Sequence, residues 1–163
     1  MKRSAVIGAS VTLFVLALSG SGISGDKDSG VKYPEGYRGW THVKSMVIEE
    51  GHPLHNAFGG IHHIYANKKA LDGLKKNSYP DGSVFIFDLL EASKKENAIT
   101  EGARKVIGIM EKDQKKFSST GGWGFEAFKG DTTERVVKDP KADCFTCHET
   151  EKQTDFVFSG YRK

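Results

Sequence analysis

The chain has 163 residues, a formal net charge of +3 and 37% hydrophobic residues. Lys2 and Arg3 supply two of these charges and residues 1–25 contain no acid, so the rest of the chain carries a formal charge of +1. A chain so close to neutral, with no basic stripe, gives no basis for nucleic-acid binding. The 138 residues after position 25 are enough for one domain with one core.

The start of the chain has the pattern of an export signal. An apolar stretch over residues 5–18 follows the two basic residues, and small residues fill positions 19–25. This pattern predicts a signal peptide over residues 1–25, and its apolar stretch is too short to span a membrane. We therefore expect a periplasmic mature protein with no membrane span. It would consist of a flexible leader (residues 26–32) and one domain (residues 33–163).

Five short segments have the composition of strands, and glycine-rich turns or short helical segments separate them. β-branched, aromatic and alternating apolar residues predict strands at residues 40–48, 60–67, 83–90, 105–112 and 122–128. Helical patterns occur at residues 68–76, 113–118 and 142–152, the last of them after Pro140. The order predicts an α+β, β-rich fold, with an antiparallel sheet and a few short helices.

Both cysteines of the chain lie in one motif near the C-terminus, Cys144-Phe145-Thr146-Cys147-His148. Cys-x-x-Cys-His is the attachment sequence of c-type haem, in which two thiols bond to the haem and the adjacent histidine binds the iron. We predict one covalent haem c per chain, held by Cys144 and Cys147, with His148 as the axial iron ligand. A zinc site, a thioredoxin-like redox pair and a local disulfide are the alternatives.

The second axial position of such an iron would be filled by methionine, by histidine or by no side chain at all. Met46 and Met110 lie in apolar strand patterns, which is typical of core methionines. His62 and His63 fall on opposite faces of a strand, so at most one of them points inward. The other histidines of the expected mature chain are His42, His52 and His55. The residues alone leave the sixth ligand open.

Four segments of the domain, beyond the haem motif, resemble the cytochrome P-460 family. They are YPEGYRGW at residues 33–40, YPDGSVFIFDLL at 79–90, GWGF at 122–125 and TDFVF at 154–158. The family also carries its haem motif near the C-terminus, and the resemblance extends over about residues 33–161. It implies an exported, β-rich homodimer with a five-coordinate haem and an open distal side.

The family has two branches that differ in a bond to the haem. In cytochrome P-460 proper a lysine is cross-linked to the haem and the protein oxidises hydroxylamine, whereas cytochrome c′-beta lacks the cross-link and binds nitric oxide or carbon monoxide. The resemblance puts Phe87 at the lysine position, which implies the cytochrome c′-beta branch. It also implies that Phe58 and Phe87 cap the distal face of the haem. Judged by pattern alone, ordinary sheet core is the commoner case for both rings.

We therefore expect a haem protein that binds small gases, nitric oxide or carbon monoxide, as a scavenger or sensor rather than as an enzyme. An apolar cap supplies no sixth ligand and no hydrogen bond for bound dioxygen. One alternative is an oxidoreductase acting on hydroxylamine or nitric oxide, with Asp88 or Glu126 as proton acceptor, although both are expected to face solvent. The other is a simple electron-transfer cytochrome c with a redox partner protein.

Overall fold

The computed structural model describes residues 29–162, so the expected signal peptide lies outside the described residues. Its centre is an antiparallel sheet in which five strands follow one another in chain order. The strands are β1 (Thr41–Ile48), β2 (Gly60–Ala66), β3 (Val84–Lys95), β4 (Ala98–Lys112) and β5 (Trp123–Lys129). Each of the five predicted strands is present, and the β-rich α+β fold class is confirmed.

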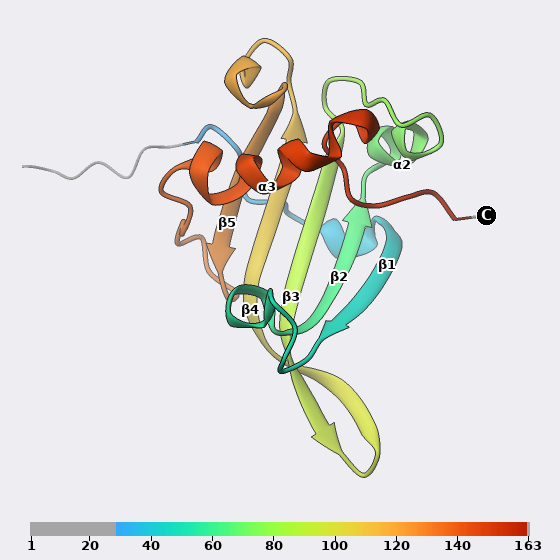
Figure 1. Ribbon diagram of the computed structural model, residues 1–163, viewed down its shortest axis with the longest axis vertical. Coiled ribbons are helices and arrows are strands. Elements are labelled where there is room, and N and C mark those ends of the chain that lie inside the picture. Colours follow the sequence, from blue (N-terminus) through green and yellow to red (C-terminus); the bar gives the residue numbers. More distant parts are fainter. Residues whose placement is uncertain (1–28, 163) are drawn as a thin grey trace, which may run out of the picture.

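β3 and β4 are much longer than the sequence pattern predicted. Beyond residue 90 they form a two-stranded hairpin arm (residues 91–104), whose register ends with Lys95 opposite Ala98. Glu96 and Asn97 make the turn with φ values of 52° and 62°, the left-handed pair of a type I′ hairpin. Figure 1 shows the arm projecting past the end of the other strands. The arm was missed because its exposed positions are charged and polar, without the apolar alternation of a half-buried strand.

The helical elements are short and lie outside the sheet. α1 (His55–Phe58) was not predicted, whereas α2 (Lys68–Leu74) was, and its first turn is capped by the Asn67 carboxamide oxygen accepting from the Ala70 N–H at 2.9 Å. The predicted helix after Pro140 is one continuous run of changing pitch. It consists of a π-helical turn (Lys141–Phe145), α3 (Thr146–His148) and 3₁₀ turns (Glu149–Thr154). Residues 113–118 form turns that lead into a 3₁₀ turn at Ser118–Thr120.

The sheet is covered on both faces, and each face has its own core. The C-terminal run crosses one face near one end, α1 lies over the same face closer to the arm, and the N-terminal segment passes behind the sheet (Figure 1). On the first face, side chains of the sheet pack with α2 and the C-terminal segment; the fully or almost fully buried members include Ala70, Leu74, Phe85, Trp123, Phe125 and Phe145. On the second face Ile86, Ile107 and Phe128 pack against Val31 and Tyr37.

The domain starts earlier than expected from composition. Residues 29–32 belong to the predicted flexible leader, but Val31 is completely buried against the sheet. Burial of a valine side chain stabilises a fold by about 1.5 kcal/mol or more. Residues 29–32 are therefore part of the folded domain. None of the helices within residues 29–162 is long and apolar enough to cross a membrane.

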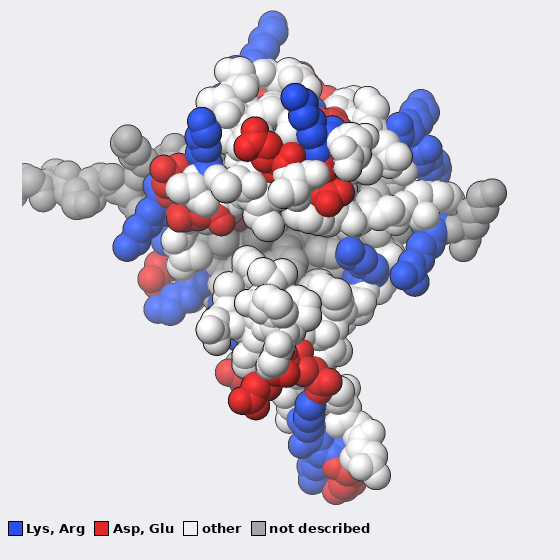
Figure 2. Space-filling view, in the orientation of Figure 1, with Lys and Arg blue, Asp and Glu red and all other residues white. Residues whose placement is uncertain are grey.

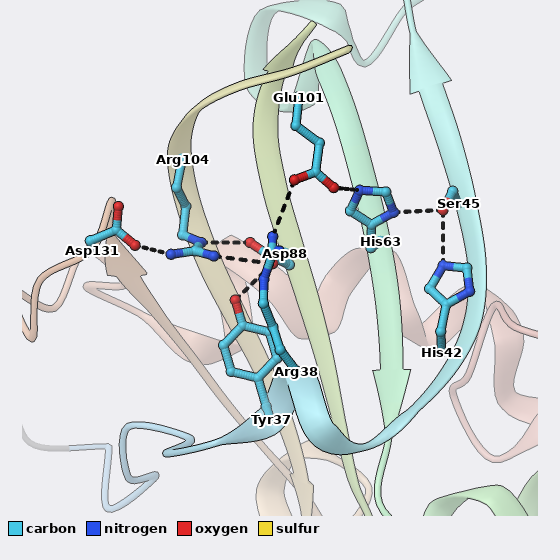
Figure 3. A network of polar contacts seen from close by, with 9 residues as sticks. All are labelled: Tyr37, Arg38, His42, Ser45, His63, Asp88, Glu101, Arg104 and Asp131. Carbon is cyan, nitrogen blue, oxygen red and sulfur yellow. Dashed lines mark hydrogen bonds and ion pairs between the residues drawn. The ribbon is translucent and has the colours of Figure 1, made fainter. Parts of the chain in front are cut away.

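A buried carboxylate on β3 ties the second face together. Asp88 has no exposed surface and accepts hydrogen bonds from Tyr37 Oη at 2.7 Å, Arg38 Nη2 at 2.9 Å and Arg104 Nε at 2.7 Å. Burial opposes its ionisation, but the hydrogen bonds from Arg104, Tyr37 and Arg38 prevail and lower the pKa of Asp88. The network then runs outward through Glu101 to His63 (Figure 3).

The expectation that Asp88 and Glu126 face solvent is wrong. Glu126 is only 2% exposed and pairs with Arg135 at 2.6 Å. Both carboxylates lie on the face that the N-terminal segment covers. Strand periodicity within residues 83–90 and 122–128 does not reveal this burial, because it does not show whether another segment covers a given face.

Replacing Asp88 by Asn should destabilise the protein by about 3 kcal/mol, because it removes the anion shared by two arginines. The folded-state pKa of Asp88 is lowered, so its stabilising contribution is complete above the unfolded value of about 4 and is lost as the pH falls through the folded value. Chemical denaturation at pH 7 and at decreasing pH measures both effects. Glu101→Gln is the control, since Glu101 is 43% exposed and its loss should change stability by less than about 1 kcal/mol. Equal stability of the Asp88→Asn variant and the parent at pH 7 would contradict the assignment.

Candidate functional site

The three residues of the Cys-x-x-Cys-His motif lie on consecutive turns of the C-terminal helical run. Cys144 lies in the π-helical turn and packs against the first core, while Cys147 in α3 is exposed. Both thiols are free, so the motif does not form a local disulfide in this structure. Burial, with a smaller effect of Asp143, raises the pKa of Cys144 to about 12, so its thiol is protonated at neutral pH.

His148 is held in one tautomer. Its Nδ1 lies 2.8 Å from the carbonyl oxygen of Phe156, and because a carbonyl can only accept, Nδ1 carries the proton and donates it. Nε2 therefore keeps its lone pair. Burial lowers the pKa of His148 against the effect of this hydrogen bond, and the rings of Phe125 and Phe158 each lie 5.0 Å from the imidazole. A neutral, oriented imidazole with an available Nε2 is the form that binds a metal.

The segment that carries the Phe156 carbonyl is anchored to the sheet by Asp155. Its carboxylate pairs with Lys112 Nζ at 2.6 Å and accepts the Tyr79 N–H at 3.2 Å, and its carbonyl accepts from Trp123 Nε1 at 2.9 Å. Asp155 and Phe156 have φ values of 52° and 67°, so the chain reverses direction there and returns the carbonyl to the helix. The side chain of Lys112 is fully buried, which makes this ion pair a strong constraint.

Three rows of side chains cross the first face of the sheet, because residues paired in antiparallel strands share a face. The first row is Ala66, Phe85, Met110 and Phe125; the second is Ile64, Phe87, Gly108 and Ala127; the third is His62, Leu89, Val106 and Lys129. Successive rows are two residues, about 6.8 Å, apart. The imidazole of His148 contacts the first row through Phe125.

The two phenylalanines expected at the distal side are in contact. Phe58 from α1 meets Phe87 from the second row edge to face, with ring centroids 5.6 Å apart. They come from different elements, and only the fold brings them together. Phe58 remains 39% exposed, which is unusual for a phenylalanine of a finished core.

His62, one of the histidines considered above for the second axial position, adjoins the same rings. It is 3% exposed, its ring lies 4.7 Å from that of Phe87, and its buried Nδ1 has no hydrogen-bond partner among the residues described. An unpaired buried polar atom costs about 1–3 kcal/mol. Burial, aided by the charge of Lys44, lowers the pKa of His62 to about 4. Its neighbour His63 lies on the opposite face, where it meets Ser45 Oγ at 2.6 Å.

The two methionines differ in burial. Met110 is 7% exposed in the first core, as predicted. Met46 is 43% exposed, so the expectation of a core position is wrong for it. The reason is that β1 is an edge strand, with a neighbour on one side only.

Several large apolar side chains remain uncovered between the C-terminal run and α1. They include Met46, Phe58 and Phe158, which are 43%, 39% and 50% exposed. Figure 2 shows few charged side chains on the surface between these two parts. A hollow of about 430 Å³ lies elsewhere, between α1 and the base of the arm, with Glu49, Glu50, Glu91, Lys94 and Lys105 among its lining residues. Its charged lining does not suit a large apolar cofactor.

The described residues also bear on the alternatives to haem. The sheet is antiparallel throughout, without the βαβ unit of a thioredoxin-like protein. Within residues 29–162, no three His, Cys, Asp or Glu side chains gather so as to hold a metal ion.

A sequence model of the family described as Cytochrome P460 matches residues 34–159, most of the chain. The chain belongs to the cytochrome P460 family. It is therefore a haem protein of the group that includes cytochrome P460 and cytochrome c′-beta. No curated protein matches the sequence.

The residues present fit a haem. A neutral imidazole with a free Nε2 follows two cysteines three positions apart, on one side of a helical run. The neighbouring apolar side chains are partly uncovered, as expected where a flat apolar cofactor would bury them. The motif residues Cys144, Cys147 and His148 were readable from sequence, whereas the anchor at Asp155 was visible only as part of a family-like segment.

Replacing Asp155 by Asn should loosen the Phe156 carbonyl and weaken the hydrogen bond to His148. If His148 binds the haem iron, a weaker hydrogen bond makes its imidazole a poorer donor to iron, so the iron–histidine stretching frequency of the ferrous protein should fall. Resonance Raman spectroscopy measures it. Stability should also drop by about 3 kcal/mol because Lys112 loses its partner. Glu149→Gln, an exposed change on the same segment, is the control and should leave the frequency unaltered. An unchanged frequency in the Asp155→Asn variant would show that the anchor does not orient the histidine.

Proposed function

We propose that the protein is an exported c-type cytochrome of the cytochrome c′-beta kind, which binds nitric oxide or carbon monoxide at a five-coordinate haem. Cys144 and Cys147 would hold one haem covalently, and His148 Nε2 would bind its iron. The contact between Phe58 and Phe87 carries the proposal. Two touching rings, with phenylalanine at the position of the cross-linking lysine, provide an apolar distal side without a ligand.

The haem, when bound, supplies an iron centre that coordinates a small gas. The chain's own residues determine which gases stay. The Phe156 carbonyl fixes the tautomer of His148, so the proximal side offers one neutral nitrogen. Phe58 and Phe87 exclude water and cannot donate a hydrogen bond. A polarised ligand such as dioxygen gains no stabilisation there, whereas nitric oxide and carbon monoxide depend on it less.

The burial of the two acidic residues favours binding over the enzyme alternative. Asp88 and Glu126 lie on the second face and are ion-paired, Asp88 with Arg38 and Arg104 and Glu126 with Arg135. A carboxylate held by arginine is a poor proton acceptor, because the pairing favours its charged form. Of the two methionines weighed as a sixth ligand, Met110 is packed in the first core and is not available to the iron.

Localisation in the periplasm and assembly as a homodimer belong to the same proposal. The hairpin arm supports the dimer. It extends beyond the sheet and exposes 44% of Ile99, and an isolated two-stranded hairpin is only marginally stable in water. Contact with a second copy would cover it.

Covalent attachment predicts that haem stays with the polypeptide after acid–acetone extraction. Mass spectrometry of the denatured protein should give the chain plus one haem, and tryptic mapping should place the haem only on the peptide with Cys144 and Cys147. Cys144→Ala together with Cys147→Ala should release the haem. A chain mass without haem would refute the proposal, and a second haem-linked peptide containing a lysine would move the protein to the cross-linked branch.

Phe58→Ala should speed the association of carbon monoxide with the ferrous protein, because it shortens the cap. The side chain is partly exposed, so the cost in stability should be about 1 kcal/mol, less than for a fully buried ring. Stopped-flow measurement well below the unfolding temperature separates the two effects. Ile99→Ala, an equally exposed apolar residue on the arm, is the control. An unchanged association rate in the Phe58→Ala variant would mean that the ring does not cover the binding position.

A further inference from the structure

His62 is a buried histidine that the proposed gas-binding mechanism does not use. Its Nδ1 has no hydrogen-bond partner in the part of the chain that the structure describes. Buried polar groups in native proteins are nearly always paired, so an exception calls for an explanation. His63 provides the contrast, since its imidazole contacts Ser45 and lies 2.7 Å from Glu101 (Figure 3). The two adjacent histidines therefore lie on opposite faces of the sheet and have different neighbours.

The register places His62 on the same face of the sheet as Phe87 and Phe125. His148 contacts Phe125 in the first row, Phe87 lies in the second row, and His62 lies in the third. Seen from His148, His62 is therefore beyond Phe87 on the same face of the sheet. The rings of His62 and Phe87 are 4.7 Å apart and inclined by 36°, so one ring leans against the other.

We propose that His62 is a latent sixth ligand to the haem iron, which the ring of Phe87 keeps at a distance. The inference rests on the proposed five-coordinate haem with Phe87 on its distal side. Phe87 is then a spacer as well as a cap, because it separates the iron from an imidazole. Burial lowers the pKa of His62 to about 4, so at neutral pH the imidazole is uncharged and one of its two ring nitrogens keeps a lone pair.

Because the ring of Phe87 alone forms the proposed spacer, one substitution at this position would remove it. Gly108, the partner of Phe87 on β4, has no side chain, and a Cβ built there would lie 3.3 Å from the Cβ of Phe87. No β4 side chain opposite Phe87 therefore forms a second barrier. Shortening Phe87 would open a path between the second and third rows. His62, with an unpaired nitrogen, would then be free to turn towards the iron.

The test compares the ferric holoprotein with Phe87→Ala, Phe87→Ala/His62→Leu and Phe87→Ala/His63→Leu. Absorption and electron paramagnetic resonance spectra report the spin state. The parent should be high-spin and five-coordinate, and the Phe87→Ala variant low-spin with two imidazole ligands. The His62→Leu double variant should return to high spin, whereas the His63→Leu control should stay low-spin because His63 lies on the other face. Phe87→Val with the same pair of second changes replaces the series if the alanine variant does not fold.

The outcomes separate this inference from the function on which it rests. A high-spin parent together with high-spin Phe87→Ala and Phe87→Val variants overturns the latent ligand and leaves gas binding intact. Low-spin spectra that persist after His62→Leu overturn it as well, because another residue would then be the ligand. A parent that is already low-spin refutes the five-coordinate haem itself, and the inference with it. A parent without covalent haem refutes the proposed function.

Discussion

The buried ion pair between Lys112 and Asp155 is the constraint on which the proposed haem-binding end of the molecule depends. Lys112 ends β4 with a fully buried ammonium, which must have a partner, and it also lies 4.9 Å from the Trp123 ring. Asp155 is that partner, so the C-terminal tail cannot leave the sheet without exposing the charge to an apolar core. Because Phe156 follows directly, its carbonyl is held where His148 Nδ1 needs it.

β3 performs two tasks with neighbouring residues. Phe87 faces the proposed cofactor, and Asp88 faces the opposite side, where it binds Arg38 and Arg104. The ionic contacts of Asp88 join the N-terminal segment to β4 and hold the central strand in place. They thereby set the position of Phe87 without touching the cofactor.

The four segments that resemble the cytochrome P-460 family contact one another in the structure. Residues 33–40 and 79–90 meet at Asp88, while 79–90, 122–125 and 154–158 meet around the tail anchor.

Much of the fold could be predicted from the sequence, because strand alternation and turn residues are local signals. The haem motif was equally readable, since the spacing of its residues reflects the chemistry of attachment. Contacts between distant elements could not be predicted. The burial of Asp88 depends on contacts with Tyr37 and Arg38, which lie 51 and 50 residues away along the chain, and the exposure of Met46 depends on β1 being an edge. Likewise, alternation put only one of His62 and His63 inside, and pairing decided which one.

The rings of Phe58 and Phe87 restrict how a gas would enter. In the proposed arrangement His148 would hold the haem on one side, and the rings of Phe58 and Phe87 would cover its other side. A diatomic ligand must then displace a phenylalanine. Phe87 belongs to a central strand and is braced by His62, whereas Phe58 ends a helix of four residues and is 39% exposed. In the proposed arrangement Phe58 would therefore be the ring that moves, so the short helix α1 would set the rate of gas entry while Phe87 would preserve the open coordination position.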